Sequence, residues 1–279
     1  MSAPQFVAVG HVTLDRFGDR VRPGGAVAYA ALTAHRLGLS AGILTSHAAD
    51  FPLDALPPQI EVVSVDAPST TTFVHADSAS GRALTVGAAA RPLGPADVPE
   101  DWRDAPLVLL APVIGEVDPD VRRAFPEATL GAAAQGWLRT IGPGGAVETP
   151  PWTPPAGLLG ALQALFVSDE DVRGQEALVT EWVQRLPLAV VTAGAAGALL
   201  YVNGERYEVR PRPSREVDPT GAGDVFAAAF LARYRLEGDP WRAAAAASVA
   251  AGLSVEGEGW SAVPDAASLA AELAAYERE

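Results

Sequence analysis

Short apolar runs alternate with longer alanine-rich segments along most of this 279-residue chain, and this alternation restricts the fold more than any other feature. Residues 6–9 and 107–111 have the length and composition of buried strands. Residues 26–37 and 170–186 follow a helical pattern. Such alternation is typical of α/β proteins, in which a mostly parallel sheet carries helices on both faces. We expect one domain of this kind over residues 1–279.

One segment interrupts the alternation. Residues 70–76 and 82–86 are β-prone and are joined by the polar residues 77–81, which predicts a hairpin. A hairpin within an α/β series predicts a small sheet that projects from the main domain.

Composition excludes several classes of function. The formal net charge of −14 argues against nucleic acid and anionic membranes as partners. The absence of cysteine excludes disulfides, thiolate catalysis and cysteine–zinc sites. The sequence contains neither an apolar run long enough for a membrane span nor a basic N-terminal segment typical of a signal peptide, so we expect a cytoplasmic protein.

All of the basic residues apart from histidine are arginine, because the chain contains no lysine. This excludes the Walker-type phosphate loop, the protein-kinase phosphate site and Schiff-base chemistry, each of which needs a lysine amine. A dinucleotide oxidoreductase is excluded as well, since no Gly-x-Gly-x-x-Gly follows the first predicted strand.

The run Val217–Asp224 is the most informative local motif. Gly221-Ala222-Gly223 allows a tight turn with little side chain between backbone and ligand, and residues 225–234 predict a helix. The unpaired N–H groups and the dipole at a helix start favour an anion. Asp224 places a carboxylate beside that anion, as expected of a base that deprotonates a hydroxyl attacking a phosphoryl group. The alternative is an N-capped helix after a glycine turn.

Polar residues at predicted strand ends are further site candidates, because ligands bind at the carboxyl ends of the strands in such sheets. Asp15, Ser168 and Thr192 hold such positions, and the loop that starts at Asp218 is expected at the same edge.

With Asp218–Asp224 near the C-terminus and Gly24-Gly25 near the N-terminus, the sequence resembles the PfkB (ribokinase-like) carbohydrate kinase family over nearly its whole length. The resemblance implies a ribokinase-like three-layer α/β/α domain with a mostly parallel sheet and a small β-sheet lid, formed near 11–22 and 66–90. It implies transfer of the γ-phosphoryl group of ATP, with Mg²⁺, to a hydroxyl of a small sugar or cyclitol. It also allows a monovalent cation such as K⁺ and a homodimer joined through the lid.

The resemblance also assigns roles to the motif residues. Asp224 becomes the catalytic base and Gly221, Ala222 and Gly223 the anion hole. We expect Asp224 to be ionised at neutral pH, because the helix dipole favours the anion. Contacts to the nucleotide are implied at Thr192, Gly194, Gly197, Thr220 and Ser248. By itself, the turn 192–197 is also compatible with an ordinary hairpin entry.

The implied acceptor site lies near the N-terminus. Asp15 is expected to accept hydrogen bonds from acceptor hydroxyls, and Gly24 and Gly25 to let the backbone approach the acceptor. The alternative for Asp15 is a residue that caps the end of a strand. The alternative for Gly24 and Gly25 is the ordinary start of a helix. Tyr29 stands where many relatives carry Asn, and with Pro219 it favours the myo-inositol kinase branch. Ribose, nucleosides and phosphorylated hexoses remain alternatives as acceptors, and a core aromatic is the alternative role of Tyr29.

Two further features depart from the family pattern. The family's Asn-x-x-Glu motif appears as Ser168-Asp169-Glu170-Asp171, so Asp171 is expected to organise Mg²⁺ through water. Arg139 is expected to reach the transferred phosphate in place of the missing lysine, with a solvated surface arginine as the alternative. The altered magnesium motif also leaves open a non-catalytic sensor on the same fold, although such a sensor has no need of Asp224.

Overall fold

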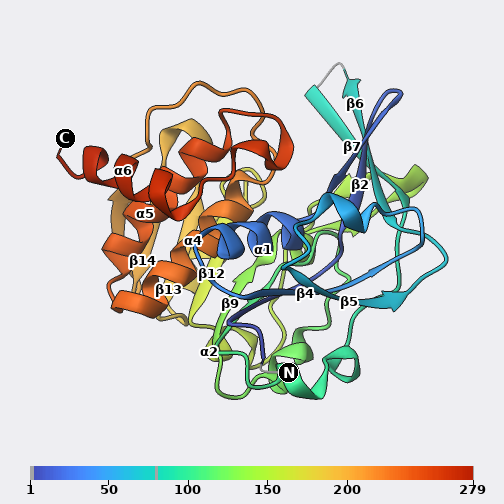
Figure 1. The fold of residues 1–279 in the computed structure, drawn as a ribbon, viewed down its shortest axis with the longest axis horizontal. Coiled ribbons are helices and arrows are strands. Elements are labelled where there is room, and N and C mark those ends of the chain that lie inside the picture. The colour runs from blue at the N-terminus through green and yellow to red at the C-terminus, as the bar shows by residue number, and fades with distance from the viewer. Residues whose placement is uncertain (1–2, 79–80, 279) are drawn as a thin grey trace.

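The computed structural model describes residues 3–78 and 81–278. Its central sheet has nine strands in the order β15-β14-β13-β12-β9-β8-β1-β4-β5 (Figure 1). Their bounds are β1 (Phe6–Val9), β4 (Ala41–His47), β5 (Glu61–Asp66), β8 (Leu107–Leu110), β9 (Thr129–Ala133), β12 (Ala164–Ser168), β13 (Leu188–Thr192), β14 (Ala198–Val202) and β15 (Glu205–Val209). All neighbours from β5 to β13 pair in parallel, and β14 and β15 add an antiparallel edge. The predicted α/β class is therefore confirmed.

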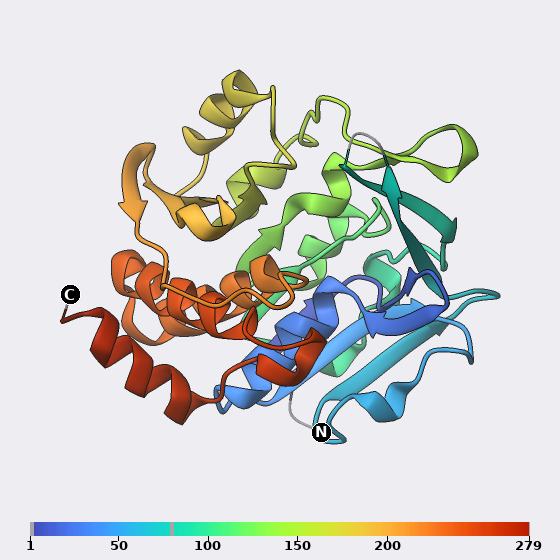
Figure 2. The same ribbon diagram turned by 90° about the horizontal axis from the view of Figure 1, so that it is seen from above.

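Four helices cover one face of the sheet (Figures 1 and 2). They are α1 (Ala26–Arg36), α4 (Ala222–Glu237), α5 (Pro240–Ser254) and α6 (Ala266–Tyr276). Residues 225–232 of α4 are all buried, because this helix packs against α1, α5 and the sheet. The many alanines let the backbones approach closely. Asp239 caps α5, since its carboxylate accepts from the N–H groups of Trp241 and Arg242 at 3.0 Å.

The opposite face is covered mainly by 3₁₀ turns and loops, with two short helices, α2 (Leu158–Ala161) and α3 (Glu176–Val183). Its core includes the fully buried Trp102 and Trp182. The prediction that a helix begins at residue 170 is wrong, because Gly174 takes a φ of 77° and ends the turn that precedes α3.

The lid is a separate four-stranded sheet in the order β3-β2-β6-β7, which projects from one end of the molecule (Figure 1). Its strands are β2 (Thr13–Phe17), β3 (Arg20–Gly24), β6 (Thr71–Ser78) and β7 (Gly81–Ala88). The predicted hairpin is the β6–β7 pair, and residues 79–80 of its turn lie outside the described residues. A small ribbon, β10 (Thr140–Ile141) with β11 (Val147–Glu148), lies beyond β7.

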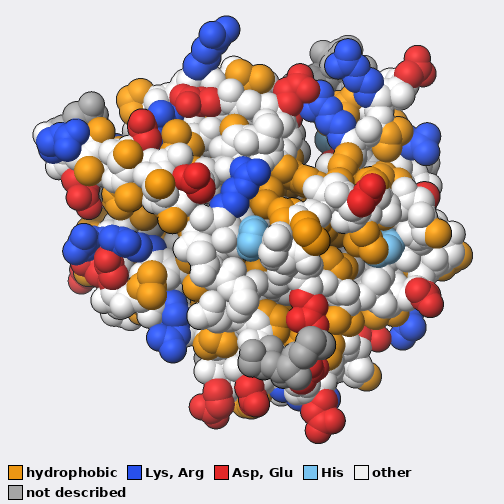
Figure 3. Space-filling view, in the orientation of Figure 1, with side chains coloured by type: hydrophobic (Ala, Val, Ile, Leu, Met, Phe, Trp, Pro, Cys, Tyr) orange, Lys and Arg blue, Asp and Glu red, His pale blue; other side chains and the backbone are white. Residues whose placement is uncertain are grey.

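Acidic and basic side chains are interspersed over the face of the molecule shown in Figure 3. None of the helices in the described part of the chain combines the length and the apolar character that a membrane span requires.

Candidate active site

The carboxyl ends of the parallel strands bring the predicted site residues to one edge of the sheet. Ser168 and Thr192, the last residues of β12 and β13, are register partners. Strand β9 runs parallel to β12 and leads through a 3₁₀ turn to Arg139. Helix α4 packs on β8, β9 and β12.

The glycine turn before α4 has the conformation that the sequence predicts. Gly221 is the N-cap, with a φ of 78°, and its carbonyl accepts from the Val225 N–H at 2.9 Å. Among the described residues, the amides of Gly221 and Gly223 have no backbone acceptor, whereas the Ala222 N–H donates to the Pro219 carbonyl at 3.2 Å. The structure therefore leaves two of the three predicted amides free for an anion.

Asp224 lies in the first turn of α4 and is partly buried. Burial raises the pKa of Asp224 to about 7; the charge of Arg139 opposes this shift and that of Asp171 adds to it. The sequence predicts a fully ionised carboxylate at neutral pH because of the helix dipole. The structure differs because desolvation of this side chain favours the protonated form.

The side chain of Arg139 is only 15% exposed, so the alternative of a solvated surface arginine is wrong. Its guanidinium lies 3.6 Å from Asp171 and donates to the Val113 carbonyl at 3.4 Å. Burial lowers the pKa of Arg139, and the carboxylates of Asp171, Asp224 and Glu116 oppose that shift. Arg139 therefore places a positive charge within range of the candidate base.

Asp171 is 8% exposed and already surrounded by donors. The Ser168 hydroxyl donates to it at 2.6 Å and the Gln135 amide at 3.2 Å. Within residues 3–78 and 81–278 no group of three or more histidines and acidic residues could hold a metal ion by itself. A metal beside Asp171 would therefore need most of its ligands from water and from a bound phosphate.

Glu116 is a buried carboxylate that the sequence analysis missed. It accepts from the backbone N–H groups of His11 at 3.0 Å, Val113 at 2.9 Å and Ile114 at 2.8 Å. Glu116 thus connects the segment at His11, which leads into the lid, with the loop that contains Val113. The carbonyl of Val113 in turn accepts from Arg139. A single glutamate in a loop gives no sequence signal for such a contact.

A cavity of about 290 Å³ lies between the lid and the main domain. Its lining comes from β2, β3, α1 and the loops flanking α4 and α5: Asp15, Phe17, Arg22, Pro23, Tyr29, Asp218, Thr220, Glu258, Gly259 and Trp260. Asp15, Tyr29 and Thr220, which the sequence assigns to substrates, therefore meet at one place.

Gly24 and Gly25 lie next to the wall of this cavity, at positions where a side chain would not fit. A Cβ at Gly24 would lie 2.4 Å from a carboxylate oxygen of Asp15. Gly25 has a φ of 102°, and a Cβ there would lie 2.5 Å from the His11 carbonyl. Any larger residue at either position would displace Asp15 or the start of α1.

Tyr29 connects the cavity to the glycine turn. A Cβ at Gly221 would lie 2.4 Å from the Tyr29 ring, so the ring covers the backbone of this glycine. Burial raises the pKa of the Tyr29 hydroxyl, and the carboxylates of Asp218, Asp224 and Asp15 raise it further. The candidate base and the lid carboxylate are therefore both near this one phenol, which is 3% exposed.

The turn after β13 and the middle of α5 differ in accessibility. Gly194 is exposed, whereas a Cβ at Gly197 would lie 2.3 Å from the Val209 carbonyl. Ser248 is buried, and its hydroxyl donates to the Arg210 carbonyl at 2.8 Å. The Ser248 hydroxyl is therefore already engaged by the chain itself.

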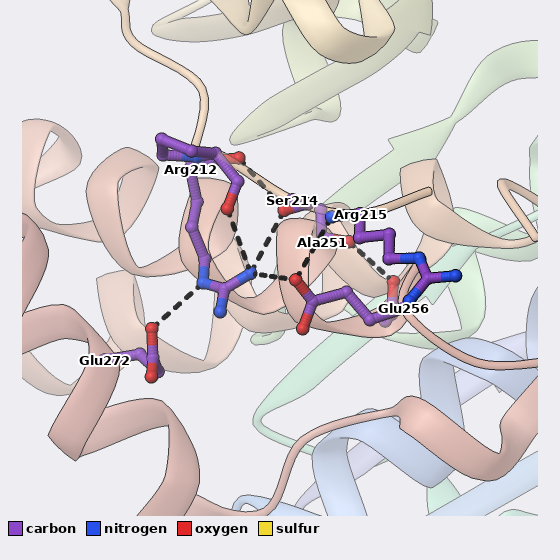
Figure 4. Close-up of polar contacts among 8 residues, drawn as sticks. Arg212, Ser214, Arg215, Ala251, Glu256 and Glu272 are labelled. Carbon is purple, nitrogen blue, oxygen red and sulfur yellow. Dashed lines mark hydrogen bonds and ion pairs between the residues drawn. The ribbon is translucent and has the colours of Figure 1, made fainter. Parts of the chain in front are cut away.

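Side-chain contacts of Arg212 hold the segment after β15 against α5 (Figure 4). The guanidinium contacts Glu256 at 2.8 Å and Glu272 of α6 at 3.1 Å, and it donates to the Ser214 hydroxyl at 3.1 Å. A Cβ at Gly252 would lie 2.8 Å from that hydroxyl, so this part of α5 is covered.

Comparison with known proteins identifies the family. Residues 160–266, which include the glycine turn and Asp224, match the family described as pfkB family carbohydrate kinase. The predicted resemblance to the pfkB family is therefore confirmed over this part of the chain. The similar proteins include a cytidine kinase from Thermococcus kodakarensis, 29% identical over 257 residues, which cover 82% of this chain and 87% of the relative.

An inositol 3-kinase from Zea mays is 34% identical over 176 residues, and the match covers 59% of this chain and 45% of the maize protein. A solved pyrophosphate-dependent kinase of the ribokinase family, complexed with a pyrophosphate analog and myo-inositol, aligns with a TM-score of 0.77 at 21% identity, covering 95% of this chain and 99% of that chain. The ribokinase-like fold is therefore confirmed.

Proposed function

We propose that this chain is an ATP-dependent kinase that phosphorylates a hydroxyl of a small sugar, cyclitol or nucleoside. The observation that carries the proposal is the position of Asp224. It lies beside two free amides at the start of α4, in the turn whose Gly221 backbone is covered by the Tyr29 ring at the wall of the lid cavity. The maize inositol kinase and Tyr29 support a cyclitol acceptor, and the archaeal cytidine kinase supports a nucleoside.

Each of these residues has a separate role in the proposed reaction. Asp15 holds acceptor hydroxyls, and Asp224 receives the proton as the acceptor oxygen forms its bond to the γ-phosphorus and the bond to the leaving ADP oxygen breaks. The Gly221 and Gly223 amides and the Arg139 guanidinium stabilise charge on the transferred group. Because the transition state is loose, positioning contributes more than early removal of the proton.

The donor set near Asp171 fits a Mg²⁺ ion held mainly by the ATP phosphates and water. When bound, Mg²⁺ neutralises charge on these phosphates. Asp218, the carboxylate of the glycine-turn motif, already accepts from Thr220 at 3.0 Å, Gly259 at 3.1 Å and Arg22 at 3.2 Å, so a K⁺ ion at this carboxylate would have to share it with these donors. Burial alone would raise the pKa of Asp218, but these partners hold the pKa below its usual value.

Pyrophosphate is a second candidate donor. Ser248, where a nucleotide contact is expected, and Gly252 on the same helix face the Arg210–Ser214 segment that Arg212 holds in place. A phosphate donor that carries no nucleobase would need only the exposed turn at Gly194 and the start of α4. The pyrophosphate-dependent structural neighbour supports the same alternative.

The rate of the proposed reaction should depend on pH around neutrality. Because burial raises the pKa of Asp224 to about 7, a growing fraction of the base is protonated as the pH falls through 7. We expect kcat/KM to rise from pH 6 to pH 8 and to fall about tenfold per unit well below pH 6. A profile measured at constant ionic strength that stays flat from pH 5.5 to 8.5 would remove Asp224 as the titrating base.

Asp15 should control affinity for the acceptor. We expect Asp15→Asn to raise the acceptor KM about 10- to 100-fold, because charge-assisted hydrogen bonds become weaker neutral ones. The donor KM should change less than threefold. Asp19→Asn, in the exposed turn between β2 and β3, is the matched control. An equal rise in both KM values would make the role of Asp15 structural.

A coupled screen tests the proposed function directly. Purified protein is assayed for product release with ATP or pyrophosphate over cyclitols, pentoses, nucleosides and hexoses. Turnover of any of these acceptors with ATP supports the proposal, and turnover with pyrophosphate alone supports the second donor. Tight nucleotide binding without turnover of any acceptor would favour the non-catalytic sensor.

A further inference from the structure

We propose that the lid cavity accepts only polyols that carry no negative charge and rejects phosphorylated or carboxylated acceptors. This inference rests on the proposed function and narrows its substrate class. It removes the phosphorylated hexoses that the sequence alone leaves open.

The charges that line the cavity are unequal. Asp15, Asp218 and Glu258 contribute three carboxylates, and Arg22 is the one arginine among the lining residues. With the carboxylates ionised and Arg22 protonated, the lining carries an excess of two negative charges. Asp224, once ionised, adds to this negative potential, since it also acts on the Tyr29 phenol at the cavity wall.

Arg22 is not free to bind an anionic acceptor. Its guanidinium lies 3.2 Å from Asp218 and 3.4 Å from Glu258, and it lies over the Phe17 ring at 5.3 Å. Turning Arg22 toward a phosphate would leave both carboxylates without this partner and close to the new anion. Arg139, which the proposed reaction assigns to the transferred phosphoryl group, is paired with Asp171 and is not among the residues that line the cavity.

Burial strengthens the effect of these charges. Asp15 is 8% exposed, and its neighbours Gly24 and Thr13 leave little room for water between them. Charges in such a site are screened less by salt than charges on the open surface. The remaining lining includes the rings of Phe17, Tyr29 and Trp260, which suit the C–H faces of a sugar, a cyclitol or a base.

Matched pairs of acceptors test this inference. Ribose, fructose, myo-inositol and cytidine are each compared with a monophosphate of the same compound that keeps the reacting hydroxyl free. The assays are run at pH 8. We expect every productive acceptor to be the neutral member, with kcat/KM at least about tenfold above that of its phosphate. A phosphate used as well as its neutral partner would overturn the inference.

A charge reversal at the cavity rim gives a second test. Glu258 is the most exposed of the three carboxylates, with 68% of its side chain accessible, so Glu258→Arg should fold. We expect it to shift the kcat/KM ratio toward the phosphorylated acceptor by about tenfold. Glu181→Arg, on α3 across the sheet, makes the same change in net charge and should leave the ratio unchanged. Equal shifts in both variants would show that only net charge matters and would overturn the inference.

Binding separates this inference from the proposed function. If no acceptor is turned over, the kinase proposal fails, and the shift in Tm on adding each compound still reports on the cavity. Stabilisation by neutral members alone supports the inference. Stabilisation by the phosphates, or by none of the compounds, overturns it.

Discussion

Asp224→Asn is expected to lower kcat by about 10³-fold while the KM of the donor changes little. The amide keeps the size and position of the carboxylate but cannot accept a proton from the attacking hydroxyl. The amides of Gly221 and Gly223 and the charge of Arg139 remain, so positioning and electrostatic stabilisation would still give turnover above the uncatalysed rate. Steady-state kinetics with a saturating acceptor, at pH 8, measure this loss.

The Tm of the Asp224→Asn variant shows whether it is folded. The pKa of Asp224 is about 7 in the folded protein, above its value near 4 in the unfolded chain. Asp224 therefore contributes to the stability of the folded state below about pH 4, and this contribution is lost as the pH rises to 7. The Asp224→Asn variant should therefore have a higher Tm than the parent at pH 8, and the difference should shrink as the pH falls. Asp169→Asn, exposed at the same edge of the sheet, should change neither kcat nor Tm. A kcat within tenfold of the parent would show that Asp224 is not the base.

The parts of the site that could be predicted are those encoded in consecutive residues. The glycine turn, the start of the helix that follows it and the carboxylate in its first turn all lie within Gly221–Asp224, so their relative placement depends on local backbone geometry. The strand ends at Ser168 and Thr192 were predictable because carboxyl ends of neighbouring parallel strands meet at one edge.

The parts that could not be predicted depend on contacts between distant segments. Tyr29 covers Gly221 across 192 positions, and nothing in either local sequence indicates this contact. Arg22 reaches Asp218 only because the lid folds back over the loop before α4. The expectation that Asp224 is ionised at neutral pH left out its burial, which is produced by the surrounding fold rather than by its own helix and raises its pKa to about 7.

Gly221→Ala is expected to be the most damaging single change to the structure of the site. Gly221 has a φ of 78°, where an L-residue is strained by about 1–2 kcal/mol. The new methyl group would also lie 2.4 Å from the Tyr29 ring, which adds roughly 1–3 kcal/mol for overpacking. We expect the free energy of unfolding to fall by about 3 kcal/mol, which corresponds to a Tm lower by about 8 °C. We also expect kcat/KM to fall at least about 10²-fold, because the displaced turn no longer aligns its amides with Asp224.

Gly223→Ala is the matched control, since a Cβ there meets nothing within 4 Å and the residue lies inside α4. Its Tm should stay within about 2 °C of the parent. The double variant Tyr29→Ala/Gly221→Ala separates the two costs, because it removes the collision with the ring and keeps the strained φ. If Gly221→Ala keeps both its Tm and its kcat/KM, then the turn is free to move without consequence. The free amides beside Asp224 would in that case not form the phosphate site that we propose.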